Sequence, residues 1–204
     1  MYALVEDNTI IKTYNNPRGM TIGDIQYPQN IHSLWSESDL NAIGIYTVVY
    51  DNTNKKAEEW YTNTNQTLAF AGGVVTVSYG TATAKAIADT LFTQEEEDKG
   101  LGTKDTIKLK GLKTLKKEIF DRQAAGLLVK YDWYIIRNTG ASTAIPSAIT
   151  DFRTAVRAKC NSMQAQVDGA ADVDALAALF TYTVQEDDSV TRPLGEFPTD
   201  PNAE

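Results

Sequence analysis

The chain contains one histidine, His32, and one cysteine, Cys160, the two residue types needed for a Cys–His nucleophile pair. Cys160 belongs to a helical apolar pattern, where a free cysteine usually serves as a small hydrophobic side chain. His32 lies in the loop-like segment NIHSLW. We therefore predict that neither residue is catalytic, that the protein is not an enzyme, and that it needs no zinc or other cofactor.

A second group of chemically capable residues lies in segment 132–157, DWYIIRNTGASTAIPSAITDFRTAVR. On a helix, Trp133 and Tyr134 point in different directions, whereas Trp133 and Arg137 are four residues apart and share a face. An aromatic ring beside a cation could bind a ligand. The same arrangement is common where two helices pack and an arginine reaches carbonyls or acids at the helix ends, and we favour packing. The candidates for packing or interface roles in this segment are Trp133, Tyr134, Arg137, Phe152, Arg153 and Arg157.

Charged residues occur in short runs and leave a net charge of −8 over 204 residues. The acidic runs 94–98 and 185–188 fit solvated connector and tail segments. The lysines from Lys104 to Lys117 follow acids on an expected helix, so a solvated face or pairing with nearby acids is favoured over nucleic-acid binding. The acidic balance also disfavours an anionic membrane surface, and no apolar run approaches the ~18 residues of a membrane span.

The first hundred residues are expected to be rich in strands. Two strands should flank a tight DN turn in a hairpin over Tyr2–Tyr14. Ser36, with Asp39 three residues later, resembles a capping box that opens a short helix. A strand should follow over Ile45–Asp51, and Gly72–Gly73 supplies the turn of a further hairpin.

The second half is expected to be helical. Apolar residues at steps of three and four after Lys104 predict one helix of roughly 25–30 residues that ends near Arg137. Pro146 fits the first turn of a second helix, which ends at Gly169. Asp172 can cap a short third helix, VDALAALF.

These elements predict the fold class α+β, with an N-terminal β-rich domain followed by a C-terminal α-helical hairpin with a short third helix. The expected boundaries are 1–80 for the β-rich domain, 81–104 for a connector, 105–184 for the helical hairpin domain and 185–204 for an acidic, mobile tail.

Segment 132–157 resembles a segment near the C-terminus of many virion structural proteins of tailed bacteriophages, especially marine and cyanobacterial phages. The resemblance lies in a Trp-Tyr-hydrophobic-hydrophobic-Arg pattern, an Ile-Pro pair and an aromatic-Arg-x-x-hydrophobic-Arg pattern, at Trp133–Arg137, Ile145–Pro146 and Phe152–Arg157. Segment Tyr27–Tyr46, which contains Trp35, is similar to an entry module of phage proteins associated with tail fibres.

The resemblance implies a non-enzymatic virion structural or adaptor protein that connects tail-fibre or baseplate components. Such a protein would be made in the cytoplasm of the bacterial host and would reside in the phage tail, with other tail or baseplate proteins as partners. Two alternatives stay open. One is a tail-fibre assembly chaperone that is absent from the mature particle. The other is a carbohydrate-binding or hydrolytic receptor module that uses an exposed Trp35, Trp60 or Tyr61.

The helical half is also expected to associate with another surface. Apolar residues at the start of the long helix precede the part that pairs with the second helix, so something else must cover them. These residues are Leu109, Leu112, Leu115 and Ile119. Either the β-rich domain or a homo-oligomer could provide the cover, and the resemblance favours a trimer because tail fibres are commonly threefold.

Overall fold

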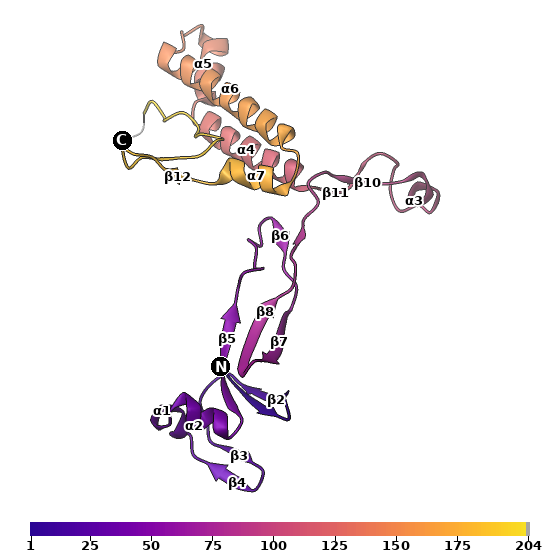
Figure 1. Ribbon diagram of the computed structural model, residues 1–204. Helices are drawn as coiled ribbons and strands as arrows, with labels where there is room; N and C mark the ends of the chain where they lie inside the picture. Colours follow the sequence, from indigo (N-terminus) through magenta and orange to yellow (C-terminus); the bar gives the residue numbers. More distant parts are fainter. Residues whose placement is uncertain (203–204) are drawn as a thin grey trace. The chain divides into compact units, whose positions relative to one another are not determined.

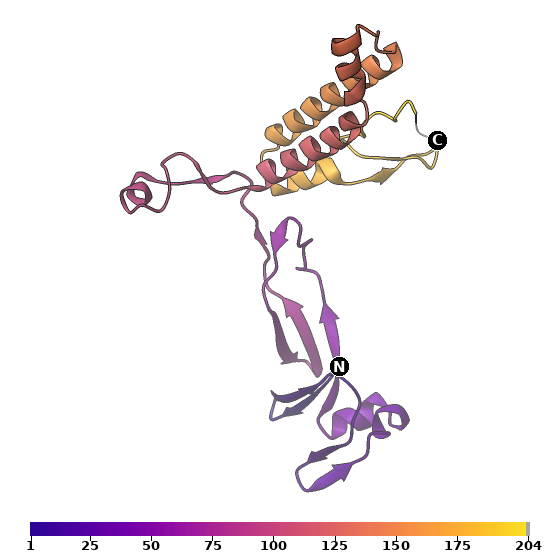
Figure 2. The same ribbon diagram turned by 180° about the vertical axis from the view of Figure 1, so that it is seen from behind.

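A computed structural model describes residues 1–202. The fold is α+β, as predicted: strands dominate one compact unit, residues 1–84, and helices dominate the other, residues 85–204 (Figures 1 and 2). The boundary lies between Ala84 and Lys85. The expected connector 81–104 is therefore not a separate part, because nearly all of it belongs to the helical unit.

The main sheet of the first unit has the strand order β2-β1-β5-β8-β7 (Figure 1). Its neighbours pair antiparallel, except for β5 and β8, which run parallel. The strands are β1 (Tyr2–Glu6), β2 (Thr9–Tyr14), β5 (Ile45–Asp51), β7 (Gln66–Ala71) and β8 (Val74–Tyr79). The unit also contains β3 (Met20–Ile22) paired with β4 (Ile25–Tyr27), β6 (Tyr61–Thr62) paired with β9 (Thr83–Ala84), and helices α1 (Ile31–Leu34) and α2 (Glu37–Ala42).

Both expected hairpins form, and their turns explain why. Asp7 and Asn8 connect β1 to β2 with φ values of 46° and 60°, and Gly72 and Gly73 connect β7 to β8 with φ values of 58° and 78°. Positive φ at both central residues matches the twist of the flanking strands, and Asn, Asp and Gly adopt it at the lowest cost.

The expected capping box also forms. The Ser36 side chain accepts from the backbone N–H of Asp39, and the Asp39 carboxylate accepts from the backbone N–H of Ser36, at the start of α2. Gly44, with φ of 82°, follows this helix, and a Cβ there would lie 2.6 Å from the Val5 carbonyl oxygen. Glycine is therefore needed for both the backbone angle and the close approach to β1.

Strand β1 is buried on both faces. Successive side chains of a strand point to opposite sides, so Leu4 joins one apolar cluster while Ala3 and Val5 join another. The first cluster contains Leu4, Tyr14, Met20, Ile31, Leu40 and Ile45, and the second contains Ala3, Val5, Val48, Val75 and Val77.

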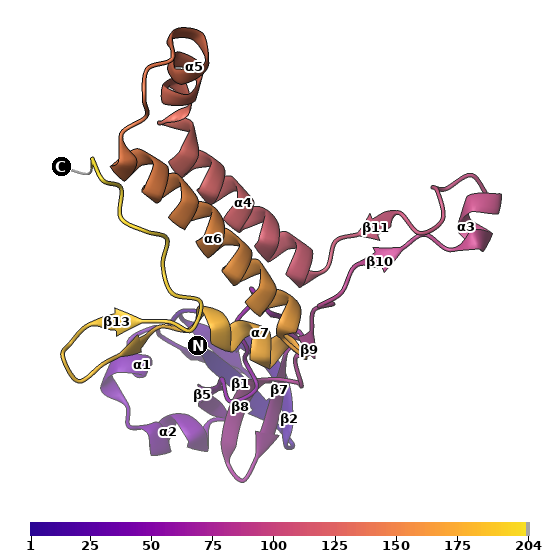
Figure 3. The same cartoon turned by 90° about the horizontal axis from the view of Figure 1, so that it is seen from above.

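The second unit is built on helices α4 (Leu112–Val129), α6 (Ser147–Gly169) and α7 (Val173–Phe180). Asp172 caps α7 as predicted, since its side chain accepts from the backbone N–H of Ala175 at 2.8 Å. Helices α4 and α6 pack side by side (Figure 3). The buried residues of α6 recur at the helical period, so they form one apolar side of this helix. Phe120 of α4 stacks on Phe180 of α7, with ring centroids 5.9 Å apart.

The prediction of one long helix ending near Arg137 is wrong. The chain leaves α4 at Lys130 and Tyr131, and a separate helix, α5 (Asp132–Ala141), follows. At the break, the Tyr131 side chain contacts residues far along the chain. The ring is buried and packs edge-on against Phe152, with centroids 5.6 Å apart, and the hydroxyl donates to the Asp200 carboxylate.

Residues 90–109 form an arm that extends from the start of α4 away from the other helices of the unit (Figure 3). It consists of the strand pair β10 (Thr90–Leu91) and β11 (Ile107–Leu109), with helix α3 (Gln94–Asp98) between them. Asp89 fixes the base of the arm: its carboxylate accepts from the Gly111 N–H at 2.6 Å and from the Thr114 hydroxyl at 2.8 Å. These hydrogen bonds lower the pKa of Asp89, and its negative charge lies at the N-terminus of α4, where it stabilises the helix.

The expectation of a mobile tail from Gln185 onward is wrong through residue 202. Strands β12 (Thr183–Val184) and β13 (Val190–Thr191) pair, and the chain then returns to the helices. Leu194 is fully buried, and its carbonyl oxygen accepts from Lys159 Nζ at 2.6 Å. We call residues 190–202 the C-terminal strap.

Candidate interaction surface

Helix α5 is positioned by Arg153, which reaches it from α6. Arg153 Nη1 donates to the Leu128 carbonyl oxygen at 2.9 Å and to Asp132 Oδ1 at 2.8 Å, and the arginine is 8% exposed. One side chain thus satisfies a carbonyl in the last turn of α4 and pairs with an acid in the first turn of α5. The sequence pattern suggested this role for Arg137 beside Trp133, but it is Arg153 that makes these contacts.

Trp133, Tyr134 and Arg137 form one stack on α5. The two aromatic ring centroids are 3.9 Å apart, and the Arg137 guanidinium carbon lies 4.6 Å from the Trp133 centroid and 5.1 Å from that of Tyr134. The prediction that the two rings point in different directions is wrong because the guanidinium, three and four residues further along, attracts both ring faces.

Trp133 does not pack between two helices, and that prediction is also wrong. Trp133 is 48% exposed, and none of the residues of α5 is buried. The buried aromatic pair at the junction of α4 and α5 is Tyr131 and Phe152. These two residues make the apolar contacts that were expected of Trp133.

The exposed side of α5 is largely apolar. Ile136 is 73% exposed and lies three residues after Trp133, so it extends the surface of the aromatic stack. We define the α5 surface as Trp133, Tyr134, Ile136 and Arg137. Val129 and Ile135 nearby are 62% and 40% exposed. Such a short helix is marginal in water by itself, and this one has no buried side chain, so covering its apolar side would stabilise it.

The positive charge of Arg137 has no negatively charged partner on this surface. Among residues 1–202 no carboxylate forms an ion pair with it, and its buried Nε has no hydrogen-bond partner. Both aromatic rings lie within cation–π distance of the guanidinium, which restricts its movement. A planar guanidinium of this kind suits a carboxylate, which it can bind through two parallel hydrogen bonds.

The other residues singled out from the helical half are dispersed. Phe152 is buried and Arg157 is exposed. Leu112 is 6% exposed, so the expectation that it needs an outside surface is wrong: its own unit covers it, where the Leu112 N–H donates to the Ala86 carbonyl at the base of the arm. Leu115 is 42% exposed, Ile119 is half-buried and Leu109 is 64% exposed.

The three aromatic residues considered for carbohydrate binding differ in how exposed they are. Trp60 is only 7% exposed, so it offers no platform, and that expectation is wrong. Tyr61 is partly exposed and lies beneath Lys56, whose Nζ is 5.5 Å from its ring centroid. Trp35 is 39% exposed and packs edge-on against Tyr27 at 5.8 Å.

His32 and Cys160 each pack within a different unit. His32 lies in α1 rather than in a loop, and its ring is 4.4 Å from that of Tyr2. Cys160 is buried on α6, as its apolar pattern predicts, and desolvation together with the nearby Asp121 carboxylate raises the pKa of its thiol. A thiol held in its neutral form is a poor nucleophile. Across residues 1–202, no group of three or more His, Cys, Asp and Glu side chains is arranged to hold a metal ion.

The lysine run is matched by acids, which confirms the preference for ion pairing. The pairs are Lys108 with Glu96, Lys110 with Glu118, and Lys117 with Asp168. Lys113 adds a hydrogen bond to the Asp168 carbonyl oxygen at 2.8 Å.

Ile136 is the surface residue that the sequence analysis overlooked. The resemblance to phage proteins includes Ile136 only as part of the Trp133–Arg137 pattern and gives no sign of its exposure.

Comparisons with known proteins give no relative: no family model matches the chain, and no curated protein or solved structure matches it either. Within residues 1–202, none of the helices combines the length and apolar character needed to cross a membrane.

Proposed function

We propose that this chain is a non-enzymatic adaptor protein that joins tail-fibre or baseplate components of a tailed bacteriophage. It works without a cofactor, is made in the host cytoplasm and resides in the phage tail, with other tail proteins as partners. The sequence resemblance over Tyr27–Tyr46 and 132–157 supports the phage assignment. The second of these segments contains the whole of α5.

One observation carries the adaptor role: the α5 surface is apolar, ordered and unused by its own unit. Exposed clusters of large apolar side chains mark sites of protein–protein contact more often than chance. Trp, Tyr and Arg are also the residue types that dominate binding energy at interfaces. Trp133, Tyr134 and Arg137 supply all three types in a single stack whose geometry is already fixed.

Quantitative mass spectrometry of purified particles tests the role. The adaptor proposal expects the chain at a fixed ratio to other tail proteins. Absence from the mature particle would overturn it and would favour an assembly chaperone, which uses the same surface only transiently.

A second experiment tests whether α5 carries this role. Ile136→Asp places a charge on the most exposed apolar residue of the surface, so the isolated protein should fold normally while its content in particles falls. Ile11→Asp is the matched control, since Ile11 is 55% exposed on β2 of the other unit. If the Ile136→Asp chain enters particles as well as the Ile11→Asp chain does, the α5 surface is not the joining surface.

A further inference from the structure

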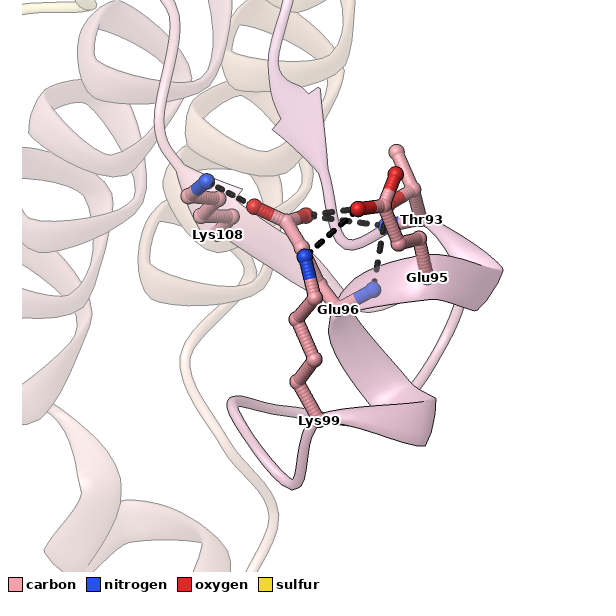
Figure 4. A network of polar contacts seen from close by, with 5 residues as sticks. All are labelled: Thr93, Glu95, Glu96, Lys99 and Lys108. Carbon is pink, nitrogen blue, oxygen red and sulfur yellow. Dashed lines mark hydrogen bonds and ion pairs between the residues drawn. The ribbon is translucent and has the colours of Figure 1, made fainter.

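The tip of the arm is a preorganised structure (Figure 4). Thr93 and Glu96 form a capping box at the start of α3: the Thr93 N–H donates to Glu96 Oε2 at 3.0 Å, and the Glu96 N–H donates to Thr93 Oγ1 at 3.3 Å. Lys108 pairs with the same Glu96 carboxylate and so ties the returning chain to the helix. Lys99 pairs with Glu95 one turn along, at 2.5 Å.

The half-buried ring of Phe92 packs against the backbone of the tip. A Cβ on Gly102 would lie 2.6 Å from this ring, so the backbone at Gly102 packs directly against it. Lys108 Nζ lies 5.9 Å from the ring centroid. The capping box, the ion pairs and this contact connect the parts of the tip within one chain, which reduces the entropy lost on binding.

The tip carries acidic side chains close in sequence to an exposed apolar one. Glu97 and Asp98 accept hydrogen bonds from the Gln94 amide, at 3.3 Å and 2.9 Å, and within residues 1–202 no cation forms an ion pair with either. Leu101, which follows them, is 62% exposed. This composition complements the α5 surface, where Arg137 lacks a carboxylate and Trp133 and Ile136 are exposed.

The two surfaces cannot meet within one chain. The arm joins α4 at its first residue and α5 follows its last, and the 18 residues of α4 separate these points by about 27 Å. Figure 3 shows the arm and α5 extending from opposite ends of α4. Their complementarity can be satisfied only between two molecules.

We propose that the arm tip of one copy docks on the α5 surface of a second copy. Glu97 or Asp98 receives the outer N–H groups of the partner's Arg137, and Leu101 covers the apolar side of the stack. Since the two contacting surfaces differ, the contact is heterologous, and it repeats into a closed ring or an open chain. This deepens the proposed function by making a second copy the partner of the α5 surface.

Sedimentation velocity on the purified chain tests the proposal through a charge swap. The wild-type protein should associate as its concentration rises. Arg137→Glu alone, and Glu97→Lys with Asp98→Lys, should each weaken association about a hundredfold or more, because like charges then face each other. An equimolar mixture of these two variants should associate again, and so should one chain carrying all three substitutions. Arg157→Glu is the matched control, an exposed arginine of the same unit outside α5, and should associate like the wild type.

Two results would overturn the proposal: a wild-type chain that stays monomeric at millimolar concentration, or charge-swapped partners that fail to associate while circular dichroism shows each one folded. Either result leaves the adaptor role intact if the chain is still present in particles at a fixed ratio. Conversely, association rescued by the swap in a chain that is absent from particles would uphold this contact and contradict the adaptor role.

Discussion

Helices α5 and α6 are neighbours in the chain and similar in apolar content, yet they use their side chains in opposite ways. Helix α6 buries its apolar stripe, with Val156, Met163 and Val167 fully buried, whereas α5 buries none of its residues and keeps Trp133 and Ile136 exposed. The helical period identifies both as helices but does not say which apolar side the same molecule covers. Packing against α4 and α7 makes α6 part of the core, whereas the apolar side of α5 stays exposed.

The largest expected effect comes from the packed side of this comparison. Phe120→Ala should lower the free energy of unfolding by about 3–5 kcal/mol, because Phe120 is 2% exposed and its removal leaves a cavity beside Phe180. Urea denaturation measures the change, and Leu115→Ala on the same helix, at a 42% exposed position, is the control. Equal costs for the two variants would mean that α4 has no packed side.

A smaller effect is expected where the two regions join. Arg153→Met keeps the packing of the stem but removes the hydrogen bonds to the Leu128 carbonyl and to Asp132, which should cost about 1.5–3 kcal/mol. Amide hydrogen exchange should increase in α5 more than in α6. Arg157→Met is the control, since Arg157 is exposed. A uniform increase in exchange over both helices would show that Arg153 does not specifically hold α5.

Local features of the fold were predictable because their causes lie within a few residues. The positive-φ turns at Asp7–Asn8 and Gly72–Gly73, the capping box of Ser36 and the cap at Asp172 all follow from adjacent side chains. The break at Tyr131 was not predictable in this way. The residues that contact Tyr131 there, Phe152 and Asp200, lie far along the chain, and the helical pattern runs through the break without interruption.

The same limit applies to the candidate site. The sequence identified Trp133, Tyr134 and Arg137 as a group, because spacing on a helix is a local property. It misplaced them in the core, because burial depends on what Arg153 and Tyr131 do at the helix junction. The segment after Gln185 was misjudged for the same reason: its acidic start indicates mobility, while the buried Leu194 anchors the strap that follows.

The strap should loosen at acid pH. Hydrogen bonds from Tyr131 and Asn202, with the nearby Lys130, lower the pKa of Asp200 in the folded protein. A lowered pKa means that its contribution to stability is present above about pH 4 and is lost as the pH falls further. Asp200→Asn should therefore be less stable than the wild type at pH 7, and the difference in melting temperature should shrink toward zero below pH 4. A difference that grew on acidification would contradict this assignment.

The most direct test of the contrast between α5 and the core is the free energy of unfolding of Trp133→Ala, measured by urea denaturation at a concentration where the protein is monomeric. A tryptophan in a core would cost about 3–5 kcal/mol on truncation. The exposed Trp133 should cost no more than about 1 kcal/mol, the value of its contact with the Arg137 guanidinium. A loss in the core range would show that α5 is packed against its own chain, and would contradict the account of α5 as a surface for a partner.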